Sequence, residues 1–147
     1  MKEFKGRVLF SGTFKGEAVV SHKGLNTLAS FQTSALLPTS KKIIVGDQNN
    51  PDLYKKNITN KALCLPQTIG STTGGMVIQT VAVRNLAPKV WLFSESIDPL
   101  AASGIILSNV WNDVGLIAID RLGEEFLSTI KTGDQIEVKE DGTVIIY

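Results

Sequence analysis

Short apolar runs that alternate with helical segments constrain this fold more than any other feature of the sequence. The runs lie at Ala62–Leu65, Val90–Phe93, residues 105–107 and residues 116–119. Each is too short for a stable helix and is bounded by Gly, Pro or polar residues, as buried strands are. Between the first two, apolar residues at helical spacing predict a helix over residues 76–86. The alternation predicts an α/β fold in which helices pack on a largely parallel sheet.

The two ends of the chain predict antiparallel pairing. Near the N-terminus, Arg7–Phe10 and residues 17–21 read as two short strands separated by turn residues. Near the C-terminus, Asp141-Gly142 separates Gln135–Val138 from residues 143–147, and Asp-Gly supplies the positive φ angles of a tight hairpin. We therefore expect a mixed, barrel-like sheet with packed helices.

The remaining segments are less regular. Residues 28–37 mix apolar and hydroxyl side chains, which predicts a strand or the wall of a site. Residues 42–45 read as another short strand, and the polar residues 46–54 as a loop of the kind that connects elements or lines sites. Asp98-Pro99 predicts the start of a short helix, because Asp caps helices and Pro suits their first turn; Gly104 would end it.

Length and composition favour a packed domain and exclude several partners. The 147 residues suit one domain over positions 1–147, and 43% are hydrophobic. The net charge of +1 provides no general field for nucleic acid or an anionic membrane. The pairs Lys41-Lys42 and Lys55-Lys56 are interpreted as solvated surface. Without an apolar run of roughly 18 residues or a secretory signal, a cytoplasmic protein is expected.

The sequence holds one cysteine, Cys64, and one histidine, His22. Cys64 lies in an apolar run, where a buried and inert thiol is expected. One Cys and one His cannot assemble a metal cluster, so we expect this chain to bind no cofactor of its own.

One loop, residues 70–75, carries the clearest chemistry. It reads Gly70-Ser71-Thr72-Thr73-Gly74-Gly75. It joins an apolar strand to the start of a predicted helix, where free N–H groups and the helix dipole bind carboxylate or phosphate. Its three hydroxyls can donate hydrogen bonds or transfer protons. Ser and Thr also cap helices without any further role, and the pattern leaves both interpretations open. No Lys follows the glycines, so this is not a Walker A loop.

Two weaker constellations involve acidic residues. His22 can be imagined in a triad with Ser71 and Asp98, although nothing in the sequence aligns the three, and a histidine at a strand end is the simpler interpretation. Asp47 and Asp52 can be imagined as an acid–base pair, but Asp is ordinary in a turn-rich loop.

Several of these segments together resemble the swivel domain of the aconitase X family. The resemblance covers about the last two thirds of the chain, and it rests on the order and spacing of its motifs. They are Asn50-Pro51, a strand that ends in Pro66, the loop from Gly70 to Gly74, Ala87-Pro88, residues 97–100, residues 102–106 and residues 132–134.

The resemblance implies a swivelling β/β/α domain and a two-chain hydro-lyase. In such members a large subunit holds an iron–sulfur cluster on cysteines, and a small chain of this kind closes over it. Ser71 then corresponds to the family's catalytic serine, which removes a proton, while Gly70, Thr72, Thr73 and Gly74 bind the substrate. The family dehydrates or isomerises hydroxy acids, including cis-3-hydroxyproline and, in archaeal relatives, phosphomevalonate.

The chain departs from the family at places that bear on substrate. Residues 30–34 read Ser-Phe-Gln-Thr-Ser where many members have Ser-Phe-X-Gly-Gly, Asn50 replaces a His, and Thr72 replaces a Ser. Residues 30–34 and the loop from Asp47 to Asp52, in which Asp47 and Asn50 are expected to bind the substrate, are expected to form the side of the pocket that recognises the rest of the substrate. Their amide and hydroxyl groups favour a small hydroxy acid such as a hydroxyproline, with phosphomevalonate as the alternative.

Two interpretations from other classes remain open at this stage. One is a non-catalytic module that holds a small carboxylate or phosphate at residues 70–75. The other is a phosphocarrier domain with His22 as the phosphorylated residue.

Overall fold

The computed structural model describes all 147 residues, and eight of its strands form one sheet. The sheet order is β1-β10-β9-β3-β5-β7-β8-β2. The strands are β1 (Lys2–Lys5), β2 (Arg7–Phe10), β3 (Phe14–Val20), β5 (Ala62–Leu65), β7 (Val90–Phe93), β8 (Ile117–Asp120), β9 (Gln135–Val138) and β10 (Thr143–Ile146).

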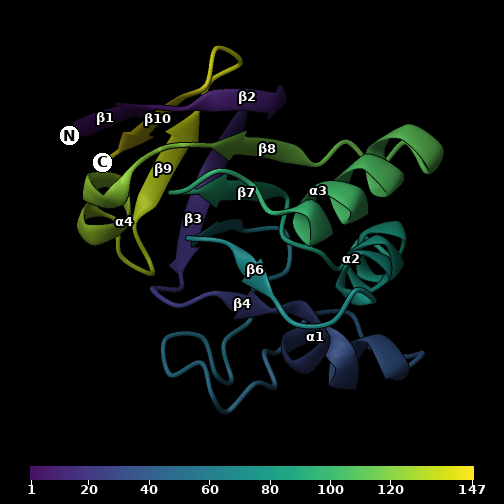
Figure 1. The fold of residues 1–147 in the computed structure, drawn as a ribbon. Coiled ribbons are helices and arrows are strands. Elements are labelled where there is room, and N and C mark those ends of the chain that lie inside the picture. Colours follow the sequence, from purple (N-terminus) through teal and green to yellow (C-terminus); the bar gives the residue numbers. More distant parts are fainter.

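The sheet curls into a nearly closed barrel (Figure 1). Its edge strands β1 and β2 are consecutive in the chain, with only Gly6 between them, and the Gly6 N–H donates to the carbonyl of Gly142 at 3.2 Å. Strands β3, β5, β7 and β8 run parallel, whereas β1, β2, β9 and β10 pair antiparallel with their neighbours. The predicted mixed, barrel-like sheet is confirmed.

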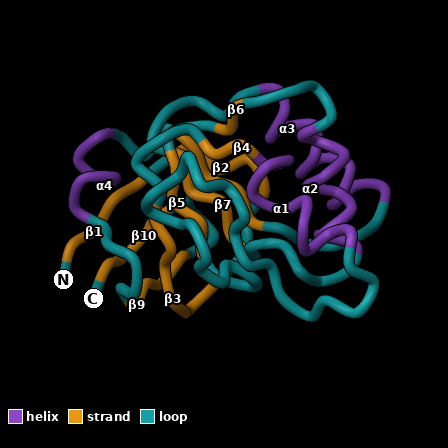
Figure 2. Tube along the Cα trace, turned by 90° about the horizontal axis from the view of Figure 1, so that it is seen from below, coloured by secondary structure: helices purple, strands orange, loops and turns teal.

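Three helices pack together on one side of the sheet: α1 (Thr27–Leu36), α2 (Gly74–Val83) and α3 (Pro99–Ile106). Figure 2 shows them grouped opposite α4 (Glu124–Thr129). A π-helical turn, η1 (Leu107–Trp111), extends α3, and a separate parallel ribbon joins β4 (Leu25–Asn26) to β6 (Thr68–Ile69). No helix combines the length and the apolar character needed to cross a membrane.

Strand β5 shows how the sheet separates two apolar cores. Because successive side chains point to opposite faces of a strand, Leu63 and Leu65 belong to the core that α1, α2 and α3 cover. Ala62 and Cys64 belong to a second core that contains Phe126 of α4. Cys64 is fully buried, as expected, and burial raises the pKa of its thiol, with the charge of Asp134 adding to the effect.

The interpretation of residues 28–37 as a strand is wrong, because Thr27–Leu36 forms helix α1. Their alternative role, as the wall of a site, stays a prediction. The side chain of Asn26 accepts a hydrogen bond from the Ala29 N–H at 3.0 Å and caps the helix. The buried positions Thr27, Ser30, Phe31 and Ser34 follow helical spacing. Three of these four are hydroxyl residues, so the buried face lacks the apolar contrast that marks most amphipathic helices.

Two other local interpretations need correction. Residues 105–107 form no strand, because α3 runs through Gly104 to Ile106. Gly104 allows close helix packing instead of ending the helix: a Cβ there would lie 2.7 Å from the carbonyl oxygen of Gly75 on α2. Residues 42–45 form only an isolated bridge between Ile44 and Asn57.

Asp120, at the end of β8, is a buried carboxylate that ties the barrel edge to the loop before α3. Its Oδ1 accepts from Arg7 Nε at 2.9 Å, and its Oδ2 accepts from Arg7 Nη2 at 2.6 Å and from the Ile97 N–H at 2.8 Å. Burial raises the pKa of Asp120, but these hydrogen bonds and the charges of Arg7 and Arg121 outweigh it and lower the pKa below its ordinary value.

We predict that Asp120→Asn lowers the free energy of unfolding by about 2 kcal/mol at pH 7, because a charged hydrogen-bond acceptor is lost. A carboxylate with a lowered folded-state pKa stabilises the fold above its unfolded-state pKa of about 3.9, and this stabilisation is lost as the pH falls through the folded-state value. We therefore expect urea unfolding to show a smaller difference in the free energy of unfolding between wild type and Asp120→Asn at about pH 3 than at pH 7. An equal difference at both pH values would contradict this account. Glu140→Gln, which removes a carboxylate from the exposed surface, is the control.

Candidate functional site

The ribbon of β4 and β6 positions the loop that the sequence singles out. Strand β6 leads directly into Gly70, whose φ of +114° is a conformation that other residues rarely adopt. A Cβ on Gly70 would also lie 3.1 Å from Oδ1 of Asn26, the residue that caps α1. Glycine is required here because the backbone must turn tightly against the start of α1.

The hydroxyls of this loop do not cap α2. Thr73 is the N-cap residue, yet no side-chain hydrogen bond caps the helix. Instead, Thr73 Oγ1 lies 2.6 Å from Ser71 Oγ, at hydrogen-bond distance. Ser71, Thr72 and Thr73 are all exposed. The sequence left two interpretations open, and the structure excludes the one in which these side chains only cap the helix. Their hydroxyls face solvent at a helix N-terminus that no side chain caps.

Gly74 and Gly75 fix the start of α2 between its two neighbouring helices. A Cβ on Gly74 would lie 2.7 Å from Oγ1 of Thr27 on α1, and Thr27 Oγ1 donates to the Gly74 carbonyl at 3.4 Å. On the other side, Gly75 packs against Gly104 of α3. Gly74 is buried, and the structure shows it packing against α1. Its role in binding substrate stays a prediction.

Asp98 connects the loop to α3. Its Oδ1 accepts from the Thr68 N–H at 2.7 Å, while its Oδ2 accepts from Thr68 Oγ1 at 2.5 Å and from the Ala101 N–H at 3.1 Å. The predicted cap of α3 is confirmed. The bonds to Thr68 hold β6, the strand that enters the loop. The sequence offers no signal for this contact, because Thr68 lies 30 residues away.

Asn50 and Asp47, predicted to contact substrate, lie in a different loop. Asn50 is 2% exposed, its Nδ2 donates to Ser21 Oγ at 2.9 Å, and its Oδ1 accepts from the Leu53 N–H at 3.2 Å. Asp47 Oδ1 accepts from the Asn49 N–H at 2.9 Å. These bonds shape the loop itself, and no hydrogen bond joins either residue to Ser71, so their contact with substrate stays a prediction.

His22 does not assemble the imagined triad. The backbone N–H of His22 donates to Asp52 Oδ2 at 2.7 Å, and the ring Nδ1 of His22 lies 3.1 Å from the same oxygen. Asp98 is engaged with Thr68 and α3, and Ser71 bonds to Thr73. Asp52 pairs with His22 and not with Asp47, so the imagined acid–base pair is not formed either.

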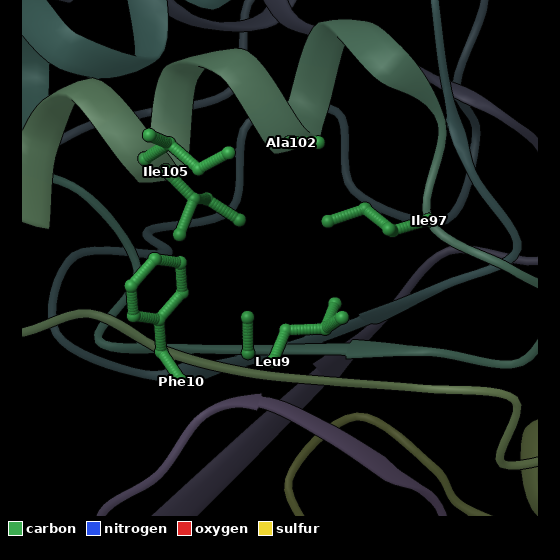
Figure 3. Close-up of a pocket in the computed structure, with 7 residues that line it drawn as sticks. Leu9, Phe10, Ile97, Ala102 and Ile105 are labelled. Atoms are coloured by element: carbon green, nitrogen blue, oxygen red, sulfur yellow. The ribbon is translucent and has the colours of Figure 1, made fainter.

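An apolar cavity of about 220 Å³ lies away from this loop, between α3 and the barrel strands β2 and β8 (Figure 3). All seven of its lining residues are hydrophobic. Because it offers no polar side chain to orient a hydroxy acid, the exposed loop at the start of α2 remains the candidate site.

Comparisons with known proteins agree on one family. The sequence model of the aconitase X swivel domain matches residues 3–146. The phosphomevalonate dehydratase small subunit of Methanocaldococcus jannaschii is 30% identical over 143 residues, which cover 97% of this chain and 95% of the relative. The same subunit of Methanocella arvoryzae is 30% identical over 141 residues, covering 96% and 94%.

Solved structures agree with the sequence comparisons. Aconitase X of Thermococcus kodakaraensis, in its holo-form, superposes with a TM-score of 0.81 at 29% identity, covering 100% of this chain and 99% of that one. A UPF0107 protein studied by solution NMR shares the fold, with a TM-score of 0.75 at 20% identity over 99% of each chain. The β/β/α swivel fold expected from the resemblance is confirmed.

We predict that Asp98→Ala destabilises the chain by more than the roughly 1 kcal/mol of a lost helix cap, because the bonds to Thr68 are lost as well. Asp98→Asn should fall between Ala and wild type, since a single amide oxygen can replace only part of the carboxylate. Urea midpoints rank the three proteins, and backbone amide chemical shifts of residues 71–73 report the loop. Unchanged loop shifts in Asp98→Ala would contradict a positioning role for Asp98.

Proposed function

This chain belongs to the aconitase X swivel-domain family and is the small subunit of a dehydratase, that is, a hydro-lyase chain; we propose that its substrate is phosphomevalonate. The observation that carries the proposal is the match over nearly the whole chain to small subunits of that name, at 30% identity in two archaea. The preference for a hydroxyproline-like acid, drawn from residues 30–34, Asp47 and Asn50, receives no support from these relatives. It stays an untested prediction.

A small subunit implies a large-subunit partner, and we propose that this partner holds an iron–sulfur cluster. The residues of this chain do not suit such a group. Its one cysteine, Cys64, is buried in the sheet with its pKa raised, whereas a cluster needs accessible thiolates. No group of three or more His, Cys, Asp or Glu side chains is arranged so that it could hold a metal ion.

The contribution we propose for this chain is a serine that removes a proton. A serine hydroxyl is a weak base, so Ser71 can act only if its alkoxide is stabilised. The uncapped N–H groups and the dipole at the start of α2 supply positive potential there. Thr73 Oγ1, 2.6 Å from Ser71 Oγ, is placed to donate a hydrogen bond to the alkoxide. The partner's cluster would supply Lewis acidity toward the departing hydroxyl group.

The same loop can hold the substrate while Ser71 acts. Gly70 has no side chain to block the approach of a carboxylate to the backbone, and Thr72 presents an exposed hydroxyl. A carboxylate bound at this helix N-terminus would place the adjacent carbon near Ser71, as removal of a proton from that carbon requires. The loop thus combines an anion site with a proton acceptor, the pair of functions that dehydration of a hydroxy acid needs.

Replacing Ser71 tests the proposal. In the reconstituted two-subunit enzyme we expect Ser71→Ala to lower kcat for phosphomevalonate by on the order of 10²–10⁴, the usual cost of losing a general base. Thr73→Val should lower kcat by about tenfold, through the loss of one charge-assisted hydrogen bond, and Thr73→Ser should restore most of it.

Thr80→Ala is the matched control, because it removes an exposed hydroxyl further along α2 that bonds only to the Met76 carbonyl. Its turnover should equal that of wild type. If the Ser71→Ala complex assembled normally and kept wild-type turnover, the catalytic role of Ser71 would be ruled out.

The two rival interpretations predict other results. A non-catalytic anion-binding module would bind its ligand without a partner and would show no dehydration when the large subunit is added. A phosphocarrier would depend on His22. The names of the relatives favour the dehydratase interpretation over both.

A further inference from the structure

The fold gathers three lysines around one groove that the sequence alone does not reveal. Lys41, Lys42 and Lys55 all line a hollow of about 490 Å³ between the C-terminal half of α1 and the segment that follows it. These three lysines come from the two lysine pairs of the sequence, interpreted there as solvated surface, and they meet here because the loop folds back on itself. The Lys55 N–H donates to the Val45 carbonyl at 2.8 Å, and the Val45 N–H to the Lys56 carbonyl at 3.0 Å.

The positive charge of this groove has no internal counterpart. None of its eleven lining residues is acidic. None of its three lysines takes part in an ion pair of the structure, although Lys2, Lys5, Lys15 and Lys61 each have a carboxylate partner. Ammonium groups that share a concave surface without an acid raise the local potential and attract an anion.

Arg84, just after the end of α2, offsets the negative potential of the C-terminus of α1 beside the groove. The last carbonyls of a helix carry partial negative charge. Arg84 donates to the carbonyl of Ala35 at 2.8 Å, to that of Leu37 at 2.8 Å and to that of Ser40 at 3.4 Å, all at or just after the end of α1. The guanidinium thereby neutralises the helix terminus and fixes the rim that carries Lys41.

The groove also has polar donors and a constrained wall. Thr33, Ser40 and Tyr54 bring hydroxyl groups to its lining. Lys55 has a φ of +67°, an uncommon conformation for a residue with a side chain, and its Nζ lies 5.3 Å from the centre of the Tyr54 ring. Strained positions of this kind persist where the surrounding structure holds them, and they are frequent at binding sites.

We propose that this groove binds the phosphate group of a phosphorylated small molecule. Several lysines without acids, together with hydroxyl donors, match the charge and the oxygen-rich surface of a phosphate monoester. The volume exceeds that of inorganic phosphate alone and leaves room for the organic part of the ligand. The source is either the phosphoryl group of the enzyme's own substrate or a separate phosphorylated metabolite. The proposal does not rest on the proposed substrate, because binding is measurable on this chain by itself.

Titration of the full chain with inorganic phosphate tests the site, with the amide signals of Gly46 and Lys55 as the readout. We expect saturable shifts that Lys41→Gln/Lys42→Gln weakens by about tenfold or more, as loss of charge-assisted contacts predicts. Lys131→Gln/Lys139→Gln removes the same charge from exposed positions outside the groove and should leave the affinity within about twofold.

Absence of saturable binding, or equal weakening by both pairs, would overturn the proposal, since net charge alone would then explain the result. Lys55→Gln provides a third variant, should the double variant fold poorly, and it should also weaken binding.

The source of the phosphate is decided in the reconstituted enzyme. A KM for phosphomevalonate raised about tenfold by Lys41→Gln/Lys42→Gln, with kcat unchanged, identifies the phosphoryl group of the substrate. An unchanged KM together with lost phosphate binding identifies a separate ligand. If wild-type enzyme failed to turn over phosphomevalonate while the groove still bound phosphate, the proposed substrate would fail and the groove would stand.

Discussion

The carboxylate of Asp98 is the contact on which the geometry of the site depends. It bonds to both the backbone and the side chain of Thr68 while it caps α3. Thr68 belongs to β6, the two-residue strand that delivers the chain into the turn at Gly70. The hydrogen bonds between the partly buried Asp98 and Thr68 therefore set the position of the serine loop relative to the helices. The neighbouring residue Ile97 is held in turn by Asp120, so the anchoring extends back to the barrel.

The start of α2 combines rigid support with an unsatisfied end. Gly74 and Gly75 allow α1 and α3 to approach from both sides, while no side chain caps the helix and the hydroxyls of Ser71 and Thr73 bond to each other. A chain selected only for stability would use one of these hydroxyls as a cap, which stabilises a helix by roughly 1 kcal/mol. Departures from local preference of this kind are expected where function requires an open site.

Features set by neighbouring residues could be predicted from the sequence. Strands β2, β5, β7 and β9 have the predicted bounds, and the cap of α3 by Asp98 follows from the Asp-Pro pair. Features set by distant partners could not be predicted. Gly104 packs against Gly75 of another helix and does not end α3 as the sequence predicts, and nothing near Asp98 in the sequence indicates Thr68. The lysine groove likewise exists only because the loop after α1 folds back on itself.

This chain is the small subunit of a dehydratase, and we propose that it supplies catalytic groups that its partner subunit lacks. The most direct measurement follows formation of the unsaturated product from phosphomevalonate with the purified chain, with the purified large subunit that we propose to hold the cluster, and with both together. The account predicts a colourless small chain without activity, and dehydration only when the two are combined. Product formation by the large subunit alone, at the rate of the mixture, would contradict it.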